Sequence, residues 1–351
     1  MLNRHRALAE NIYFLLTPKF SMLGFSMAVE ALRLTNRVIG HTVYRWHVVS
    51  KTGQSVMASN GISVGADCRL DTVQRECMDP TRTRMVIVCS GIEVETFDDP
   101  TVFGWLRRLH SLGVAVGGLC TGAWVLARAG LLNNRCCAIH WENLPGFAER
   151  FPGVAVKSCL FEVDHDIYTC AGGTAPLDMM LHLIGQSEGE AVVGRVCELC
   201  LVDRIRPAHD LQRLPLGARV GVQNPRLLSI IELMEANVAE PLSLADISHK
   251  TGISRRHVER LFRQHLARSP ARYYLDVRLE RARRLLRHSS LPIVEVAIAS
   301  GFVSASHFSK RYRERYGVSP QADRREYEPE PDALSEISVL GDAGFGQREV
   351  G

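Results

Sequence analysis

The sequence has no apolar run that approaches the roughly 20 residues a membrane-spanning helix needs. Its first apolar stretch, residues 12–16, is too short for a secretory signal and lacks a small-residue cleavage site after it. Apolar residues at 46% and charged residues at 23% match ordinary globular proteins, which excludes a collagen-like or globally disordered chain. We therefore expect a cytoplasmic protein that makes no contact with membranes.

Cysteine is missing from everything after Cys200. All ten cysteines lie between Cys68 and Cys200, and their scatter fits no disulfide framework of a small secreted domain. Cys197 and Cys200 form one CxxC pair, but no second pair stands at the spacing of a zinc site. We expect reduced thiols, no metal site and no cofactor.

Acidic residues are scarce in one long segment. Residues 243–327 hold 18 Lys and Arg against 8 Asp and Glu, a net charge of +10 in a chain whose total is +4. The last residues, 328–351, hold six Asp and Glu against a single Arg. A basic segment in an otherwise acidic chain favours a module that binds a polyanion, with a solvated charged face as the alternative.

The length of 351 residues suggests two or three domains, and the first part alternates short apolar runs with helical patterns. The apolar runs predict buried strands at 12–17, 43–49, 85–89, 114–116 and 167–170. Helical spacing predicts helices at 25–36, 100–112, 121–129, 175–186 and 190–205. This alternation indicates an α/β fold over residues 1–205: a doubly wound, flavodoxin-like parallel sheet with helices on both faces.

Proline and glycine mark the end of the α/β half. Residues 206–223 show no sustained period and contain Pro207, Pro215, Gly217 and Gly221, so we interpret them as a linker. Residues 224–327 carry only helical patterns and predict an all-α domain. In it, Asn224 caps a helix opened by Pro225, and a longer helix spans 271–288 with an apolar stripe rimmed by arginines. We expect the acidic tail, 328–351, to be disordered.

Within the helical half, one segment has the pattern of a helix-turn-helix unit. Ser243 begins a helix with Asp246 three residues later, Gly252 ends it, and Ser254 caps the next helix. A helix, a glycine-containing turn and a second helix are typical of DNA-reading proteins, whose second helix lies in the major groove. The early, outward side chains of that second helix would face base edges: Arg255, Arg256, Glu259 and Arg260.

The pattern repeats some fifty residues later. Residues 293–300 predict the first helix, Gly301 the turn, and Ser304 caps a helix whose Phe308 and Tyr312 point inward. Two recognition helices joined by one rigid helix could enter successive major grooves on one DNA face, about 34 Å apart. A helical protein–protein module is the alternative. Six cations on or near the two helices favour DNA: Arg255, Arg256, Arg260, Lys310, Arg311 and Arg313.

Residues 225–327 resemble the DNA-binding domain of the AraC/XylS family of bacterial transcription regulators. The resemblance rests on IVEVAIASGF at 293–302, SHFS at 306–309, Tyr312 and YGVSP at 316–320. It implies double-stranded promoter or operator DNA as a partner, with RNA polymerase as another. It places Arg256, Glu259, Arg260, Ser306 and Lys310 at base-facing positions; Arg255, Ser304, His307 and Arg311 complete the candidate contacts. Arg would pair with guanine and Glu with the cytosine amine.

A cysteine stands at a tight turn in the α/β half. The stretch VAVGGLCTGAWVLA, residues 114–127, predicts a strand, a turn carrying Cys120, and a helix whose N-terminus lowers the pKa of a thiol. Such a turn presents its side chain at the carboxyl end of the strand, so we predict that Cys120 lies at a pocket. A small buried hydrophobic side chain is the alternative.

Residues 10–200 resemble the PfpI-type and class I glutamine-amidotransferase-like superfamily, whose nucleophile turn matches Cys120. Joined to an AraC-type domain, the chain resembles the GlxA family of regulators. Four further landmarks support this resemblance: VEALR at 29–33 with Asn36; the pair Ser90–Gly91; GLL at 130–132 with His140 and Trp141; and AGGTAPLD at 171–178. The resemblance implies a ligand-sensing domain whose candidate ligand residues are Cys120, Thr121, His140, Trp141, Gly91, Gly173 and Thr174.

The sequence departs from the enzymes of this superfamily, which place a carboxylate near the end of the first strand. Here residues 18–25 contain no acid, and the next one is Glu30, inside the following helix. His140 could act as a base, but a thiol without an acidic partner lacks the usual activating arrangement. We therefore predict a binding pocket with no catalytic residue, and a protein that is not an enzyme.

The resemblance implies a small nitrogenous effector, an amino acid or a quaternary amine such as glycine betaine or carnitine. Trp141 could offer its ring to a cationic amine, although a tryptophan that packs the core is equally consistent. We expect a homodimeric, ligand-responsive regulator, most simply the activator of a catabolic operon. Two alternatives remain open: a cysteine-dependent hydrolase or amidotransferase tethered to DNA, and a constitutive DNA-binding protein whose α/β domain only dimerises.

Overall fold

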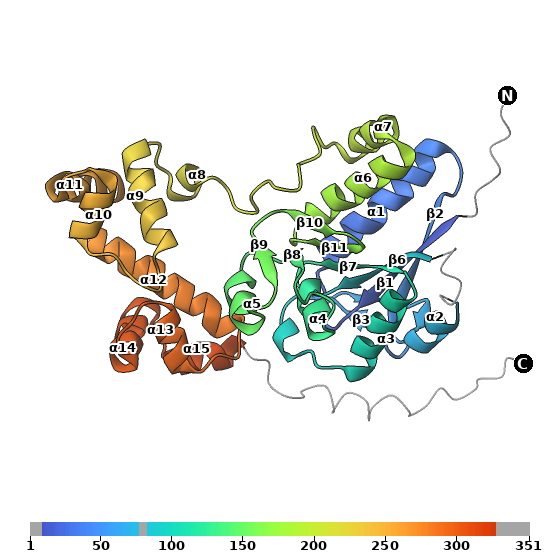
Figure 1. Cartoon of the computed structure of the whole chain (residues 1–351), viewed down its shortest axis with the longest axis horizontal. Helices are drawn as coiled ribbons and strands as arrows, with labels where there is room; N and C mark the ends of the chain where they lie inside the picture. The colour runs from blue at the N-terminus through green and yellow to red at the C-terminus, as the bar shows by residue number, and fades with distance from the viewer. Residues whose placement is uncertain (1–8, 77–82, 328–351) are drawn as a thin grey trace, which may run out of the picture.

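The computed structural model describes residues 9–76 and 83–327, in an α/β part and a helical part (Figure 1). Within these ranges, no helix combines the length and the apolar character that crossing a membrane requires. The acidic tail at 328–351, which we predicted to be disordered, lies outside the described residues.

The α/β part is built on a seven-stranded sheet in the order β10-β11-β7-β6-β1-β2-β5. The strands are β1 Glu10–Leu16, β2 Tyr44–Ser50, β5 Cys68–Arg69, β6 Thr83–Cys89, β7 Ala115–Leu119, β10 Phe161–Asp164 and β11 Ile167–Cys170. The order β2-β1-β6-β7-β11 is that of flavodoxin-like sheets, so the predicted fold class is confirmed. One detail differs from the predicted parallel sheet, because β10 pairs antiparallel with β11 at the edge.

Helices cover both faces of this sheet (Figure 1). One face carries α1 (Met22–Ile39), α6 (Ala175–Glu188) and α7 (Glu190–Cys200); the other carries α2 (Leu70–Glu76), α3 (Pro100–Ser111) and α4 (Gly122–Arg128). Along β6 the side chains of Ile87 and Cys89 enter the first core, and those of Val86 and Val88 enter the second. A strand buried on both faces needs apolar residues at every position, which explains its continuous apolar run.

All five predicted strands are present, and the predicted helices are found within a few residues of their expected ends. The helix predicted at 190–205 stops at Cys200, because Leu201 adopts a left-handed backbone with φ of 55°. The sequence pattern missed the strands β5 and β10, the helix α2, and the short elements β3 (Val56–Met57), β4 (Ser63–Val64), β8 (Cys136–Ala138), β9 (Ala155–Lys157) and α5 (Leu144–Arg150). Strands of two or three residues are too short to show any periodicity.

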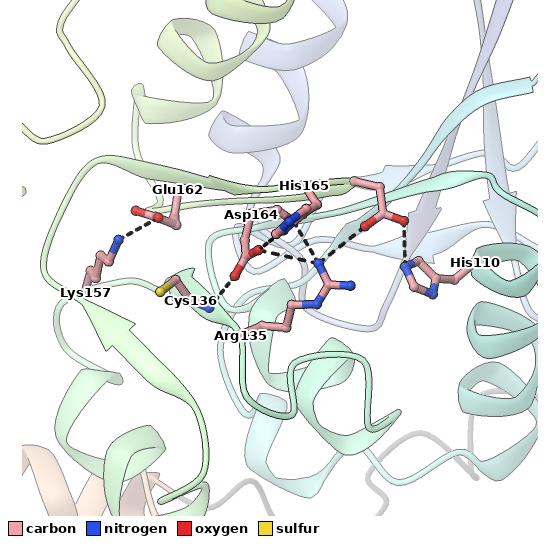
Figure 2. Close-up of polar contacts among 8 residues, drawn as sticks. His110, Arg135, Cys136, Lys157, Glu162, Asp164 and His165 are labelled. Carbon is pink, nitrogen blue, oxygen red and sulfur yellow. Dashed lines mark hydrogen bonds and ion pairs between the residues drawn. The ribbon is translucent and has the colours of Figure 1, made fainter.

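A polar network attaches the β10–β11 hairpin to its neighbours (Figure 2). Asp164 accepts the backbone N–H of Cys136 at 2.7 Å, and the Arg135 guanidinium reaches both the Asp164 carbonyl at 3.2 Å and the Asp166 carboxylate at 3.5 Å. Asp166 also contacts His110 of α3 at 2.9 Å. The antiparallel edge strand is therefore fixed by side chains that sequence periodicity does not reveal.

The helical part has two small cores spanned by one long helix. Its helices are α9 Pro225–Ala236, α10 Leu244–Thr251, α11 Arg255–Leu266, α12 Pro270–Arg287, α13 Ile293–Ala299, α14 Ala305–Tyr316 and α15 Pro320–Tyr327. The start of α12 contributes Tyr274 to the first core, with Phe262. Its second half contributes Leu279 and Leu286 to the other core, with Phe308. The predicted cap of α9 is confirmed, since Asn224 accepts the Leu227 N–H at 3.1 Å.

The segment 206–223, predicted as a linker, is attached to both parts and contains a short helix, α8 (Leu216–Val220). Arg206 donates to the buried Asp178 of α6 through its backbone N–H at 2.8 Å and its side chain at 2.5 Å. The Gln212 amide donates to the Ile139 and Cys159 carbonyls. Val222 is buried in the first helical core. The proline and glycine pattern of this segment did not reveal these attachments.

The two parts also touch directly, where α5 meets the end of α12 (Figure 1). A Cβ added to Gly146 of α5 would lie 2.4 Å from the His288 carbonyl oxygen, so this contact requires glycine. Beside it, the ring of Trp141 lies under two guanidiniums, that of Arg213 at 4.6 Å and that of Arg284 of α12 at 5.9 Å from its centroid.

Candidate DNA-binding surface and thiol site

The first helix-turn-helix unit consists of α10, a turn at Gly252 and α11. Ser243 and Asp246 form a reciprocal capping box at the start of α10, as predicted. Gly252 has φ of 68°, and Ser254 caps α11 by accepting the His257 N–H. Val258 and Phe262 are buried, while the predicted DNA-facing side chains of α11 all point to solvent: Arg255, Arg256, Glu259 and Arg260.

The second unit repeats this geometry with α13, Gly301 and α14. Gly301 has φ of 77°, and Ser304 accepts the His307 N–H at the start of α14. A Cβ on Gly301 would lie 2.4 Å from the Val238 carbonyl oxygen and 2.5 Å from Pro241 Cγ, so this turn packs against the segment between α9 and α10. Ser306, His307 and Lys310 are exposed.

Both recognition helices border open hollows on the surface. One of about 620 Å³ is lined by Ser254, Arg256, His257, Glu259, Arg260, Arg263 and Gln264. The other, about 380 Å³, is lined by Ser306, Ser309, Lys310, Arg313 and Glu314. These positions leave the base-facing candidates free to reach a groove of a duplex.

Three of the predicted contacts have other partners in the structure. The Ser304 hydroxyl oxygen is used by the helix cap. Arg311 is half-buried, donates to Glu314 at 2.9 Å and to His307 at 3.3 Å, and so belongs to an intrahelical cluster. These contacts leave Ser306 and Lys310 as the exposed candidates of α14 whose side chains make no such contact within the described residues.

The arginines along α12, expected on its rim, hold the second unit in place. Arg278 donates to the Ser300 carbonyl at 3.0 Å and to the Gly301 carbonyl, and its guanidinium lies 4.2 Å from the Phe302 ring centroid. Arg283 and Arg287 both bind the carboxylate of Asp323 on α15, which is only 1% exposed. The orientation of α14 therefore depends on charge-assisted hydrogen bonds from α12.

Cys120 occupies the predicted turn between β7 and α4, at the carboxyl edge of the sheet. Its backbone is left-handed, with φ of 59°. Glycines on either side allow the turn: a Cβ on Gly118 would lie 2.8 Å from the Ala123 nitrogen, and one on Gly122 would lie 2.5 Å from the Val88 carbonyl oxygen. A non-glycine residue in this conformation is costly, and such residues cluster at functional sites.

The thiol itself differs from the prediction. We predicted that the helix N-terminus lowers its pKa, but burial raises the pKa of Cys120 to about 12, although the Thr121 N–H opposes the shift. The acid Glu142 raises the pKa further. Removal from water therefore outweighs the short α4, and the thiol is neutral at physiological pH.

His140 lies beside the thiol, as the resemblance implied. Its backbone N–H donates to the Cys120 carbonyl at 3.2 Å, and a Cβ on Gly172 would meet both Cys120 Sγ, at 2.9 Å, and His140 Cδ2, at 3.0 Å. Burial lowers the pKa of His140, with Glu142 opposing. The Glu142 N–H donates to His140 Nδ1 at 3.4 Å, so the proton of the neutral ring sits on Nε2. Gly172 lies in the AGGTAPLD motif but was not among the predicted ligand residues, and Glu142 was missed because no motif includes it.

The other predicted ligand residues fall into two groups. Gly173 has φ of 65°, and no atom lies within 4 Å of the place that a Cβ would take there, so it borders open space. Thr121 donates to the Gly91 carbonyl at 2.6 Å and ties two loops together. Thr174 accepts from Arg206 at 2.7 Å. Trp141 contacts arginines of the helical part. The structure thus brings Cys120, His140 and Gly173 to one edge, and it uses Thr121, Gly91, Thr174 and Trp141 in internal contacts.

A larger cavity of about 700 Å³ opens next to Thr174, between α1, α6 and α7. It is lined by Met27, Glu30, Arg33, Leu34, Arg37, Thr174, Leu177, Asp178, Leu199, Cys200, Val202, Asp203, Arg204 and Arg206. Glu30 is bound by Arg33 at 2.6 Å in this cavity. The first acid after β1 is therefore engaged in an ion pair on α1.

Comparison with known proteins shows the same two-part organisation. Residues 10–186 match the DJ-1/PfpI family, and residues 247–326 match a helix-turn-helix domain family. The HTH-type transcriptional regulator GbdR of Pseudomonas aeruginosa strain PAO1 is 42% identical over 90% of this chain and 84% of its own length. CdhR of the same strain is 42% identical over 90% and 92%. GlxA of Rhizobium meliloti strain 1021 is 37% identical over 90% and 96%.

Both family resemblances predicted from the motifs are confirmed by these matches. Three relatives with identities above 30% are transcriptional regulators by name, and each is covered over more than two thirds of its length. The chain belongs to the HTH-type transcriptional regulators in which a DJ-1/PfpI domain precedes an AraC-type helix-turn-helix domain.

Proposed function

We propose that this regulator reads promoter DNA with α11 and α14 and senses a small nitrogenous effector with its α/β part. One observation carries the DNA assignment: two helix-turn-helix units of the same capped geometry expose Arg256, Glu259 and Arg260 on one helix and Ser306 and Lys310 on the other. Guanidinium and ammonium groups pair with guanine, and a carboxylate accepts from cytosine.

The single helix that joins the two units suits binding to adjacent turns of one duplex. Helix α12 joins them and has 18 residues, which corresponds to about 27 Å of helix. Successive major grooves on one face lie about 34 Å apart. Arg263 and Arg313, beside the base-facing residues, would bind phosphates and contribute affinity without sequence preference.

The thiol site favours ligand binding over catalysis. A thiol that is neutral and an imidazole whose Nδ1 already accepts a hydrogen bond do not form the thiolate–imidazolium pair of a nucleophile. Together with Gly172 and Gly173 they suit a small polar molecule, and the family resemblance suggests an amino acid or a quaternary amine. We infer that the protein is not an enzyme.

We further propose a homodimer that recruits RNA polymerase and changes the arrangement of its two parts when the effector binds. A homodimer would place two DNA-binding parts on one promoter, and RNA polymerase would be recruited there to activate a catabolic operon. The effector acts only if it binds two arrangements of the α/β and helical parts with different affinity. We place the change between these arrangements in the segment 206–223, which is attached to both parts. The corresponding domain limits are 1–205 and 224–327. The cytoplasm is where such a regulator would work.

Fluorescence anisotropy with the full chain tests the DNA assignment. The probes are a duplex from upstream of its own operon and a random duplex of equal length. We expect the promoter to bind at least about 10³-fold more tightly than the random duplex at moderate salt. Equal affinity for both duplexes would overturn the assignment.

A promoter reporter separates the sensor from the hydrolase alternative. Cys120→Ser keeps a polar hydrogen-bonding group, and Cys120→Ala removes it. A binding role predicts that Cys120→Ser retains effector-dependent activation. Release of ammonia or any hydrolysis product by the wild type that both substitutions abolish would support the enzyme instead.

A further inference from the structure

A second cavity, of about 420 Å³, lies where the segment 206–223, α9 and α12 meet. It is distinct from the thiol site and is lined by Arg213, Arg219, Val220, Glu235, Val238, Leu266, Arg268, Tyr273, Asp276, Val277, Glu280, Arg281 and Arg284. Five arginines thus face three acids in a space large enough for a small metabolite.

Two of the five arginines are neutralised by partners within the cavity wall. Arg219 binds Glu235 at 2.9 Å, and Arg268 binds Asp276 at 3.0 Å. The third acid, Glu280, is exposed to solvent. Among the described residues, no carboxylate lies within ion-pair distance of the other three guanidiniums, those of Arg213, Arg281 and Arg284.

The three arginines without an ion pair are half-buried and line the same cavity. Arg281 uses its Nε to donate to the Ala299 carbonyl at 3.1 Å, which leaves its terminal nitrogens available. Arg213 and Arg284 make no hydrogen bond to any described residue; each instead lies over the ring of Trp141. Burial and the charges of Arg213 and Arg281 lower the pKa of Arg284, while the charges of Glu280 and Glu235 oppose this shift. Burial lowers the pKa of Arg213 and of Arg281 as well.

We propose that this cavity binds a small anion that carries several acidic oxygens, a phosphate or a di- or tricarboxylate, between Arg213, Arg281 and Arg284. A guanidinium presents parallel N–H groups that match the oxygens of carboxylate or phosphate, so these three forks provide both charge and geometry. A bound anion would remove the mutual repulsion of the three cations.

The position of this site gives the anion a regulatory role. Arg213 comes from the segment that crosses between the parts, Arg284 from α12, and Trp141 follows His140 of the thiol site. An anion held by both arginines would fix α12 relative to the α/β part. This second effector site goes beyond the proposed function and does not depend on the identity of the first effector.

Thermal shift and calorimetry on the full chain, without DNA, test the proposal. The probes are inorganic phosphate and citrate at constant ionic strength, set with sodium chloride. We expect one or both probes to raise the melting temperature saturably, and to bind the Arg213→Gln/Arg284→Gln double variant at least about tenfold more weakly. Which probe binds more tightly distinguishes a phosphate ligand from a carboxylate one.

Arg226→Gln serves as the matched control, because Arg226 is exposed on α9 and does not line the cavity. It should bind the probe like the wild type. The single variant Arg213→Gln, on the crossing segment, provides a readout if the double variant unfolds, and it should also weaken binding. Stabilisation that chloride reproduces, or that survives in Arg213→Gln at full strength, would overturn the site. Because no DNA is present, either result is independent of the DNA assignment.

Discussion

Cys120 holds a strained backbone position, and burial raises the pKa of its thiol so that the thiol stays neutral. In an enzyme the same position would carry a thiolate beside a protonated histidine. Here the nearby acid Glu142 opposes ionisation of the thiol, and it lies 3.7 Å from His140 Nδ1. The same turn geometry is compatible with a reactive thiolate or with a neutral thiol. Burial and the charge of Glu142 favour the neutral thiol here.

Alkylation of Cys120 by iodoacetamide tests this neutral thiol. Since the pKa is raised to about 12, the thiolate fraction at pH 7.5 is small, and we expect labelling about 10²–10³-fold slower than for a free peptide thiol. The rate should increase with pH up to the range of that pKa. Peptide mass spectrometry measures it, with the denatured chain as the control. Rapid labelling of the native chain at neutral pH would contradict a buried neutral thiol.

Arg256 tests base recognition at a single position. Replacement by alanine should relax sequence preference at one base pair and cost about 1–3 kcal/mol on the preferred duplex. Arg313→Ala is the comparison, because a phosphate contact should weaken all duplexes alike. Binding measured against a set of single-base operator variants separates the two patterns. A uniform loss for Arg256→Ala would remove that residue from the base-reading set.

Each helix-turn-helix unit has a glycine in its turn, but the surroundings of the two glycines differ. Gly252 has open space around it, whereas Gly301 packs against Val238 and Pro241. We expect Gly252→Ala to cost only the left-handed penalty, about 1–2 kcal/mol of unfolding free energy. Gly301→Ala should cost more, because a methyl group would also collide with backbone. Chemical denaturation of both variants measures the difference, and equal losses would contradict it.

Helix α15 is fixed by one buried carboxylate. Burial would raise the pKa of Asp323, but hydrogen bonds from Tyr312, Arg287 and Arg283 outweigh it and hold the pKa below its ordinary value. Its stabilising contribution is therefore present above the unfolded pKa near 4 and is lost as the pH falls below it. Removing one partner of a buried pair typically costs about 3–5 kcal/mol, which we expect for Asp323→Ala.

Urea unfolding of Asp323→Ala between pH 3 and pH 7 checks both statements. Glu326→Ala, an exposed acid on the same helix, is the control and should change stability little. The difference between the two variants should shrink as the pH falls through the acidic range. A difference that stays constant would mean that the carboxylate charge is not what fixes α15.

Local patterns predicted the elements well where a helix or strand repeats its own period. The capping serines, the turn glycines and the buried Val258 and Phe308 all followed from spacing within a few residues. The pKa of Cys120 did not, because it depends on burial of the turn, which is contacted by His140 and Gly172 from later in the chain. The ion pairs of Asp323 with Arg287 and Arg283 were also missed, since these arginines lie 36 and 40 residues earlier in the chain.

The whole molecule depends on contacts between parts that no local pattern encodes. Trp141, a predicted ligand residue, contacts Arg213 and Arg284 at the boundary between the two parts, a placement that its local sequence does not indicate. The segment 206–223 is likewise attached on both sides, through Arg206 and Val222. These contacts would connect the effector site that we propose at Cys120 with the orientation of α12.

Footprinting of the full chain on its own promoter tests whether α11 and α14 each enter a major groove. We predict two protected major-groove segments on one face, about 10 base pairs apart. Arg256→Ala should lose protection in one segment and Lys310→Ala in the other. A single protected segment, or a loss of both segments with either variant, would contradict two independent reading helices.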